Sequence, residues 1–74
     1  MQLTFLNTPE NCQHFLRACS LHNLLPLKIK LHNKSTEAVA TFSKNEGKRT
    51  HNIAHWINNE VGNVVALVTD KATV

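Results

Sequence analysis

Apolar and polar positions alternate over residues 1–6 and 25–32, and this period of two predicts a β-strand in each segment. A third strand is predicted to pair with the second in a hairpin, and a run rich in β-branched residues predicts a fourth. The strands span residues 1–6, 25–32, 36–43 and 63–69. In the first strand the alternation places Leu3 and Phe5 on one face. The second strand has the most regular alternation, with its apolar positions at Leu25, Leu27, Ile29 and Leu31. We expect the apolar face of each strand to contribute to a common core.

Two other segments carry apolar residues at helical spacing. The first helix is predicted to begin at Thr8-Pro9-Glu10, because threonine caps a helix, proline suits its first position and glutamate meets the positive end of the dipole. Its apolar stripe consists of Cys12, Phe15, Leu16 and Cys19. The second helix is predicted to run from Thr50 to about Gly62, with a stripe of Ile53, Ala54, Ile57 and Val61.

The resulting order of strand, helix, strand, strand, helix, strand is that of the ferredoxin-like βαββαβ fold. This is an α+β architecture in which a four-stranded antiparallel sheet carries two helices on one face. The chain has 74 residues, which suffices for one core, so we expect a single domain over 1–74. An α+β sandwich with one terminal strand unpaired or exchanged between chains is the alternative. Residues 70–74 are expected to form a loose tail.

The second and third strands are close enough in sequence to form a hairpin. Pairing Leu31 with Thr36 makes a short turn in which Asn33 suits the left-handed conformation. In this register Lys30 lies opposite Glu37, a favourable pair of charges. The register also places Ala38, Ala40 and Phe42 on the face of Ile29. We therefore expect Ile29 and Phe42 to be core residues.

The composition indicates a folded protein of a reducing compartment. Hydrophobic residues make up 42% of the chain and charged residues 18%. The longest apolar run, Val64–Val68, is far shorter than a membrane span, and the N-terminus lacks a signal-peptide pattern. Cys12 and Cys19 lie seven positions apart in a predicted helix, roughly 10 Å between Cα atoms, which is beyond disulfide reach. We expect two free thiols, a cytoplasmic location and no membrane partner.

No residue set in the sequence predicts catalysis. The cysteines are assigned to a buried stripe, where a thiolate is disfavoured. Gly47 and Gly62 are the only glycines, and neither belongs to a phosphate-binding motif. Acylphosphatase-like enzymes share the topology but need an arginine after the first strand, where residues 7–10 hold no cation. We expect no catalytic residue, no cofactor and no small-molecule substrate.

His51 and His55 lie four residues apart and share a face of the second predicted helix, as paired metal ligands do. His14, His22 and His32 fall on other elements, and no nearby glutamate completes a ligand set. We therefore expect two solvated histidines and no metal site.

The distribution of charge raises the possibility of nucleic-acid binding. The net charge is +3, and six of the eight basic residues fall between Lys28 and Arg49. The candidate contacts are Lys28, Lys30, Lys44, Lys48 and Arg49, the last three in a predicted loop over 44–49. Lys34, at the hairpin tip, is far from that loop, so the six charges do not form one patch. Base stacking requires aromatic residues on the open sheet face, whereas Phe5 and Phe42 are assigned to the core.

The sheet face without helices is the leading candidate for an interaction surface, because it combines Leu6 and Val39 with Thr41. Trp56, at the border of the second helical stripe, is either a lid over the core or an anchor for a partner. These features favour a non-enzymatic protein-binding module that uses Leu6, Val39, Thr41 and Trp56. By size it compares with phage and mobile-element inhibitors or adaptors that act on a protein or nucleoprotein complex. A homodimer through the sheet face is one form of this hypothesis, and a small nucleic-acid-binding regulator is the alternative.

Overall fold

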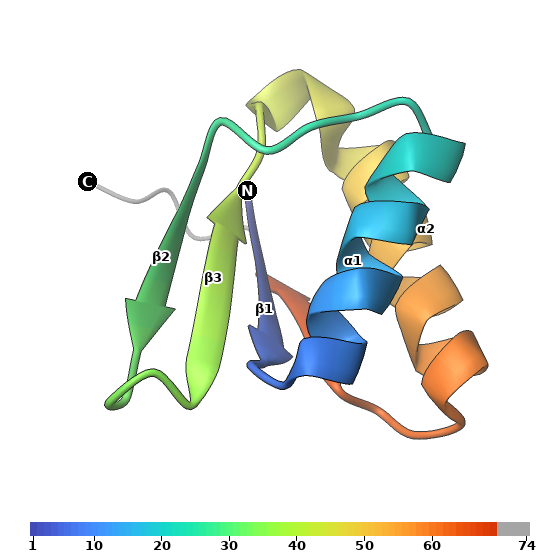
Figure 1. Cartoon of the computed structure of the whole chain (residues 1–74). Helices are drawn as coiled ribbons and strands as arrows, with labels where there is room; N and C mark the ends of the chain where they lie inside the picture. Colours follow the sequence, from blue (N-terminus) through green and yellow to red (C-terminus); the bar gives the residue numbers. More distant parts are fainter. Residues whose placement is uncertain (70–74) are drawn as a thin grey trace.

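The computed structural model describes residues 1–69, and its element order confirms the predicted α+β, ferredoxin-like arrangement (Figure 1). The elements are β1 (Gln2–Leu6), α1 (Pro9–Leu21), β2 (Lys28–His32), β3 (Glu37–Thr41), the short 3-10 helix η1 (Lys44–Glu46), α2 (Gly47–Val61) and β4 (Ala66–Thr69). The expected tail over 70–74 lies outside the described residues.

The four strands form one antiparallel sheet in the order β2-β3-β1-β4. Both helices lie on the same side of this sheet, which leaves the other face open (Figure 1). β1 and β3 occupy the centre, and β2 and β4 are the two edges. The alternation of β1 is confirmed, because Leu3 and Phe5 are both buried.

The beginning of α1 follows the predicted capping signals. The Asn11 N–H donates to the Thr8 side chain at 3.1 Å, and Pro9 takes the first helical position. The predicted apolar stripe is partly wrong, since Leu16 is 62% exposed whereas Phe15 and Cys19 are buried. The buried face instead includes Ala18 and Asn11, because α1 turns its small Ala18 toward α2 and the side chain of Asn11 donates to the Leu6 C=O at 2.9 Å.

The hairpin between β2 and β3 forms, but the predicted register is wrong by one residue on each strand. His32 is opposite Glu37, and Lys30 is opposite Val39 rather than Glu37. Thr36 belongs to the turn, because its N–H and hydroxyl both donate to the Asn33 C=O. The predicted left-handed conformation of Asn33 is confirmed, and it continues through Lys34 and Ser35. The two offsets add to a shift of two residues in the pairing, which is a full period of the strand, so each side chain keeps its predicted face.

α2 begins earlier than its apolar pattern predicts. Residues 44–49, expected to be a loop, form η1 and the first turn of α2. The Ser43 side chain accepts a hydrogen bond from the Asn45 N–H at 3.4 Å, which supports the start of η1. The predicted end of the helix is confirmed at Gly62, which takes the left-handed conformation at φ 79°.

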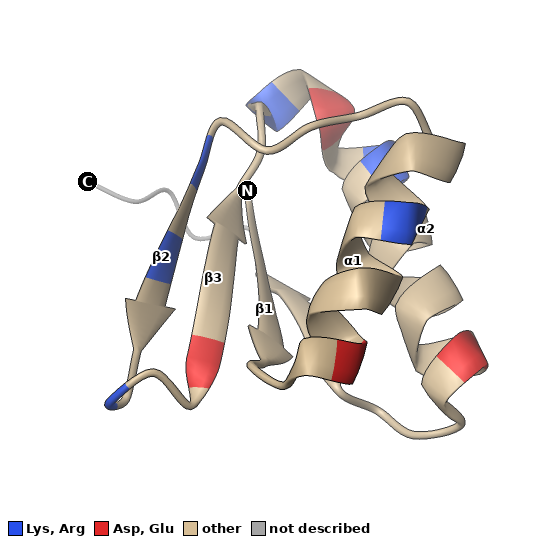
Figure 2. Ribbon diagram, in the orientation of Figure 1, with Lys and Arg blue, Asp and Glu red and all other residues tan. Residues whose placement is uncertain are grey.

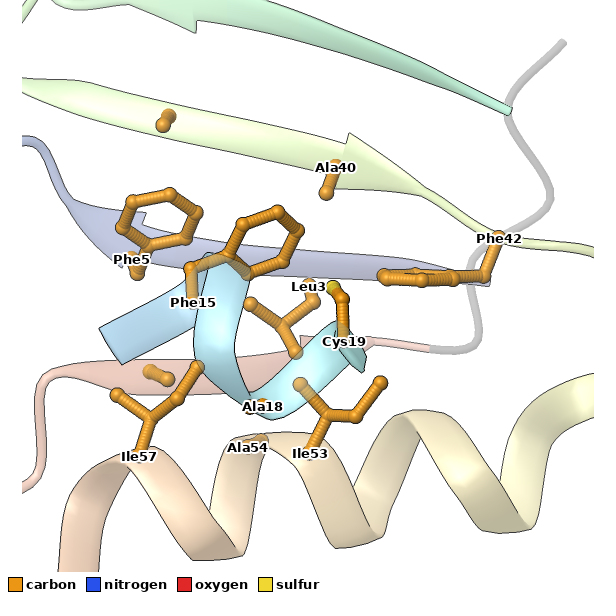
Figure 3. Packing of buried hydrophobic residues seen from close by; sticks show 12 residues of the cluster. Leu3, Phe5, Phe15, Ala18, Cys19, Ala40, Phe42, Ile53, Ala54 and Ile57 are labelled. Atoms are coloured by element: carbon orange, nitrogen blue, oxygen red, sulfur yellow. The ribbon is translucent and has the colours of Figure 1, made fainter. Parts of the chain in front are cut away.

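The core lies between the helices and the two central strands (Figure 3). The rings of Phe5 and Phe15 stack with centroids 4.8 Å apart, and Phe42 is tilted against Phe15 at 6.3 Å. The buried apolar side chains are Leu3, Phe5, Phe15, Ala18, Cys19, Ala38, Ala40, Phe42, Ile53, Ala54, Ile57 and Ala66. Residues of β2 are absent from this set, and in Figure 3 that strand carries none of the core side chains.

The prediction that the second strand faces the core is therefore wrong. Every residue of β2 is exposed, and the expected core residue Ile29 is 48% accessible. The reason is the width of the helical layer. In the described part of the chain β2 packs along β3, while α1 and α2 pack against each other and α2 extends to β4. Neither helix reaches far enough to cover the β2 edge (Figure 1).

Candidate functional site

Four large apolar side chains on β2 and its lead-in are exposed. We name them the β2 apolar row; they are Leu25, Leu27, Ile29 and Leu31, with exposed fractions of 48 to 76%. Ile29 and Leu31 pair with Ala40 and Ala38, whose side chains face the core, so both lie on the helix-bearing side of the sheet. A hollow between α1 and the lead-in is lined by Leu16, Cys19, Ser20, Asn23, Leu24 and Leu25.

The opposite side of β2 is cationic. Lys28, Lys30 and His32 alternate with the apolar positions and project from the open face of the sheet. Between Glu10 and Glu37 the sequence contains no acidic residue. Within residues 1–69 neither lysine of β2 has a carboxylate within salt-bridge distance. The strand is thus apolar on one side and positively charged on the other.

The main chain of β2 has a free outer edge. The N–H of Phe42 donates to the Met1 C=O and that of Asn7 to the Thr36 C=O, so the even-numbered residues of β3 bond toward β1. In an antiparallel ladder the odd-numbered residues then bond toward β2. The odd-numbered residues of β3 are paired with Lys28, Lys30 and His32, whose main-chain groups therefore bond toward β3. It follows that the main-chain groups of Ile29 and Leu31 point away from the sheet.

The other edge of the sheet is protected by a side chain at the beginning of β4. Asn58 of α2 accepts hydrogen bonds from the N–H groups of Val65 and Ala66, each at 2.8 Å, and its Nδ2 donates to the Ala66 C=O at 2.9 Å. Because Leu6 N–H donates to Val65 C=O, Ala66 is at an outward-facing position of the ladder. An asparagine amide therefore occupies the place that the peptide group of a further strand would take at β4.

The open sheet face, predicted as the interaction surface, carries Leu6, Val39 and Thr41 on neighbouring strands. Leu6 is half exposed, Val39 and Thr41 are half-buried, and Leu67 extends the apolar area across β4. The structure brings these three predicted residues together. Trp56 lies elsewhere, on α2, where it packs against the core and stands edge-on to His14 with ring centroids 6.3 Å apart.

The candidate nucleic-acid contacts are distributed over separate elements (Figure 2). Lys28 and Lys30 are on β2, Lys44 is on η1, and Lys48 and Arg49 are in the first turn of α2. The Arg49 guanidinium lies 3.3 Å from the Glu46 carboxylate, so part of its charge is balanced locally. Figure 2 shows acidic positions between the basic ones, which weakens any continuous positive surface.

His51 and His55 are both exposed on α2. In the described ranges the side chains of histidine, cysteine, aspartate and glutamate do not gather in groups of three that could hold a metal ion. Within residues 1–69, no helix has the length and apolar composition needed to cross a membrane.

The two cysteines differ in environment. Cys12 is half-buried and its Sγ donates to Asn7 Oδ1 at 3.2 Å. Cys19 is part of the core, and burial raises the pKa of its thiol from 9.0 to about 11. Since the thiolate is the reactive form, this environment opposes nucleophilic chemistry at Cys19.

Alkylation should report this environment directly. The Cys12→Ser variant leaves Cys19 as the only thiol. Because burial raises the pKa of Cys19 from 9.0 to about 11, its thiolate fraction near pH 8 is about 100-fold smaller in the folded protein than in the unfolded chain. We expect iodoacetamide to react with the folded variant at least that much more slowly than with the urea-unfolded protein. The thiol contribution to stability is complete below pH 9 and is lost as the pH rises toward 11, because the unfolded chain releases its proton first. Equal alkylation rates in the two states would contradict the burial of Cys19.

The sequence pattern of β2 predicted a buried strand, so the exposure of its apolar row was not foreseen. The available signal was its place in the topology, since an edge strand is the one that two helices most readily leave uncovered. The role of Asn58 was also missed, because a single asparagine on a helix has no local signature for a contact with a strand eight residues away.

Comparison with family models, with curated proteins and with solved structures finds no match for this chain.

Proposed function

We propose that this protein is a non-enzymatic module that binds another protein, as an inhibitor or adaptor does, and that β2 is its contact surface. The observation that supports this most is the β2 apolar row, in which four large aliphatic side chains are left exposed at alternating positions. Single exposed leucines are common on soluble proteins, whereas a contiguous apolar surface more often marks an interface.

The open sheet face is the competing surface for the same function. It offers Leu6, Val39 and Leu67, and it also suits association of two copies through their sheets. We favour β2 because its apolar row is accompanied by free main-chain groups, which add hydrogen bonds to apolar contact. The sheet face can offer side chains alone.

Matched substitutions distinguish the two surfaces. Ile29→Thr combined with Leu31→Thr replaces the two members of the β2 apolar row that lie within β2 by β-branched residues that suit a strand. Val39→Thr makes the same change on the open sheet face. Each variant is used as bait in the native host, and captured proteins are quantified by mass spectrometry against the wild-type bait. We expect the β2 variant to lose its main partner by at least tenfold and Val39→Thr to retain it.

The opposite pattern would move the interface to the open sheet face, and sedimentation would then show whether a second copy occupies it. Equal capture by all three baits would exclude both surfaces. Recovery of nucleic acid that disappears with Lys48→Ala and Arg49→Ala, or with added salt, would instead favour the nucleic-acid-binding alternative.

A further inference from the structure

The two edges of the sheet are not equivalent as docking sites. At β4 the outward groups of Ala66 are already bonded to the Asn58 amide. At β2 the outward N–H and C=O groups of Ile29 and Leu31 meet no further strand among the described residues. An exposed strand with free edge groups is the template to which an extended peptide adds as a further strand. Among the described residues β4 has one further outward residue, Val68, so β2 with its two free residues is the better edge for strand addition.

The side chains of β2 define which strand fits. A strand added to this edge continues the pleat, so its side chains fall alternately on the two faces of the sheet. Those beside Ile29 and Leu31 lie on the helix-bearing side, next to exposed aliphatic carbon. Those beside Lys28 and Lys30 lie on the open face, next to two ammonium groups without a described carboxylate partner. Apolar residues suit the first positions and acidic residues suit the second.

A second copy of this chain fits the same edge poorly. An antiparallel pairing that sets Ile29 of one copy beside Leu31 of the other also sets Lys30 beside Lys30. A pairing centred on Ile29 sets Lys28 beside Lys30 of the other copy. Like charges directly opposite in a sheet are destabilising, and edge lysines are a common barrier to such pairing. The lysines therefore oppose self-association through β2 and favour an acidic partner.

We propose that β2 binds an extended segment of a partner protein by antiparallel strand addition, and that this segment alternates apolar with acidic side chains. The inference rests on the proposed function and specifies the chemistry of its partner. The main chain of the segment pairs with Ile29 and Leu31, its apolar residues extend the β2 apolar row, and its carboxylates meet Lys28 and Lys30.

The first test uses synthetic peptides of about seven residues, long enough to pair along the whole strand. One alternates valine with glutamate, and a matched one alternates valine with lysine, both with blocked termini. Titration is followed by amide NMR of the full chain at low salt. We expect the glutamate peptide to bind at least tenfold more tightly and to slow amide exchange at Ile29 and Leu31. Absence of binding at about 1 mM, or protection at the outward-facing Val68 of β4 instead, overturns the proposal.

Backbone pairing is tested by N-methylation of the same glutamate peptide. In antiparallel addition the residues directly opposite Ile29 and Leu31 are the valines, and their N–H groups point at β2. Methylation of the valine nitrogens should abolish binding, while methylation of the glutamate nitrogens should change it only a few-fold. Equal binding of the two methylated peptides would exclude main-chain pairing and overturn the proposal.

Charge reversal in the protein provides the matched control. Lys28→Glu with Lys30→Glu should invert the preference, so that the lysine peptide binds more tightly than the glutamate peptide. An unchanged preference overturns the charge assignment. The proposed function and strand addition can fail separately. If the variant with Ile29→Thr and Leu31→Thr loses its partner but the peptides do not bind, protein binding through β2 stands and strand addition is excluded.

Discussion

Phe15→Ala is expected to lower the free energy of unfolding by about 3–5 kcal/mol, which approaches the total stability of a domain of this length. Phe15 is almost fully buried, and its ring links Phe5 to Phe42. Truncation leaves a cavity beside Phe5 and Phe42, and the packed elements around it cannot all move inward. Urea denaturation followed by circular dichroism measures the change.

Leu16→Ala is the matched control, because Leu16 is the next residue on α1 and is mostly exposed. We expect it to cost under about 1 kcal/mol. Ile29→Ala on β2 should also cost under about 1 kcal/mol, although its sequence pattern assigned it to the core. A loss at Leu16 comparable to that at Phe15 would mean that α1 presents the face predicted from its apolar stripe, which buries both residues, and not the face described above.

Asn58→Ala is expected to destabilise the protein by about 2–4 kcal/mol, because three hydrogen bonds of ordinary strength are lost together. The N–H groups of Val65 and Ala66 lose their acceptor, and the Ala66 C=O loses its donor. These bonds are also the link that holds the end of α2 to the beginning of β4. Hydrogen exchange should therefore accelerate at Val65 and Ala66 before it does in β1.

Asn59→Ala is the control for this variant, since Asn59 is the exposed neighbour on the same helix and gains the same helix propensity. Its stability should be unchanged or slightly raised. Because Asn58 also occupies the outer edge of β4, its removal should make this edge available for pairing and increase aggregation at high concentration. Equal stability of the two variants would show that the Asn58 contacts contribute little to the fold.

The sheet therefore has one edge that its own helix blocks at Ala66 and one edge left open. The Asn58 contact at Ala66 and like charge at β2 both limit uncontrolled pairing of copies. Within residues 1–69, β2 has outward main-chain groups at both Ile29 and Leu31, whereas β4 has them only at Val68. The β2 apolar row, the lysines of β2 and its free main-chain edge are thus combined on one short strand and its lead-in. The open sheet face remains the main competitor, and the matched threonine variants separate the two surfaces.

Local patterns in the sequence determined the helices and strands, the beginning of α1 and two left-handed backbone positions. The period of two in β1, the capping signals at Thr8 and Pro9, and the left-handed residues Asn33 and Gly62 act within a few neighbouring residues. Each therefore predicted the structure at its own position. Their order was sufficient to indicate the ferredoxin-like topology, because few chain paths connect these elements without crossing.

The tertiary structure alone decided which apolar faces are covered. Alternation in β2 is more regular than in β1, yet β1 lies under the helices and β2 extends beyond them. The rotation of α1 that exposes Leu16 and the contact of Asn58 with β4 likewise depend on residues distant in sequence. Periodicity specifies that the two faces of a strand differ in polarity. The width of the helical layer determines whether the apolar face is buried within this chain or remains exposed for a partner chain.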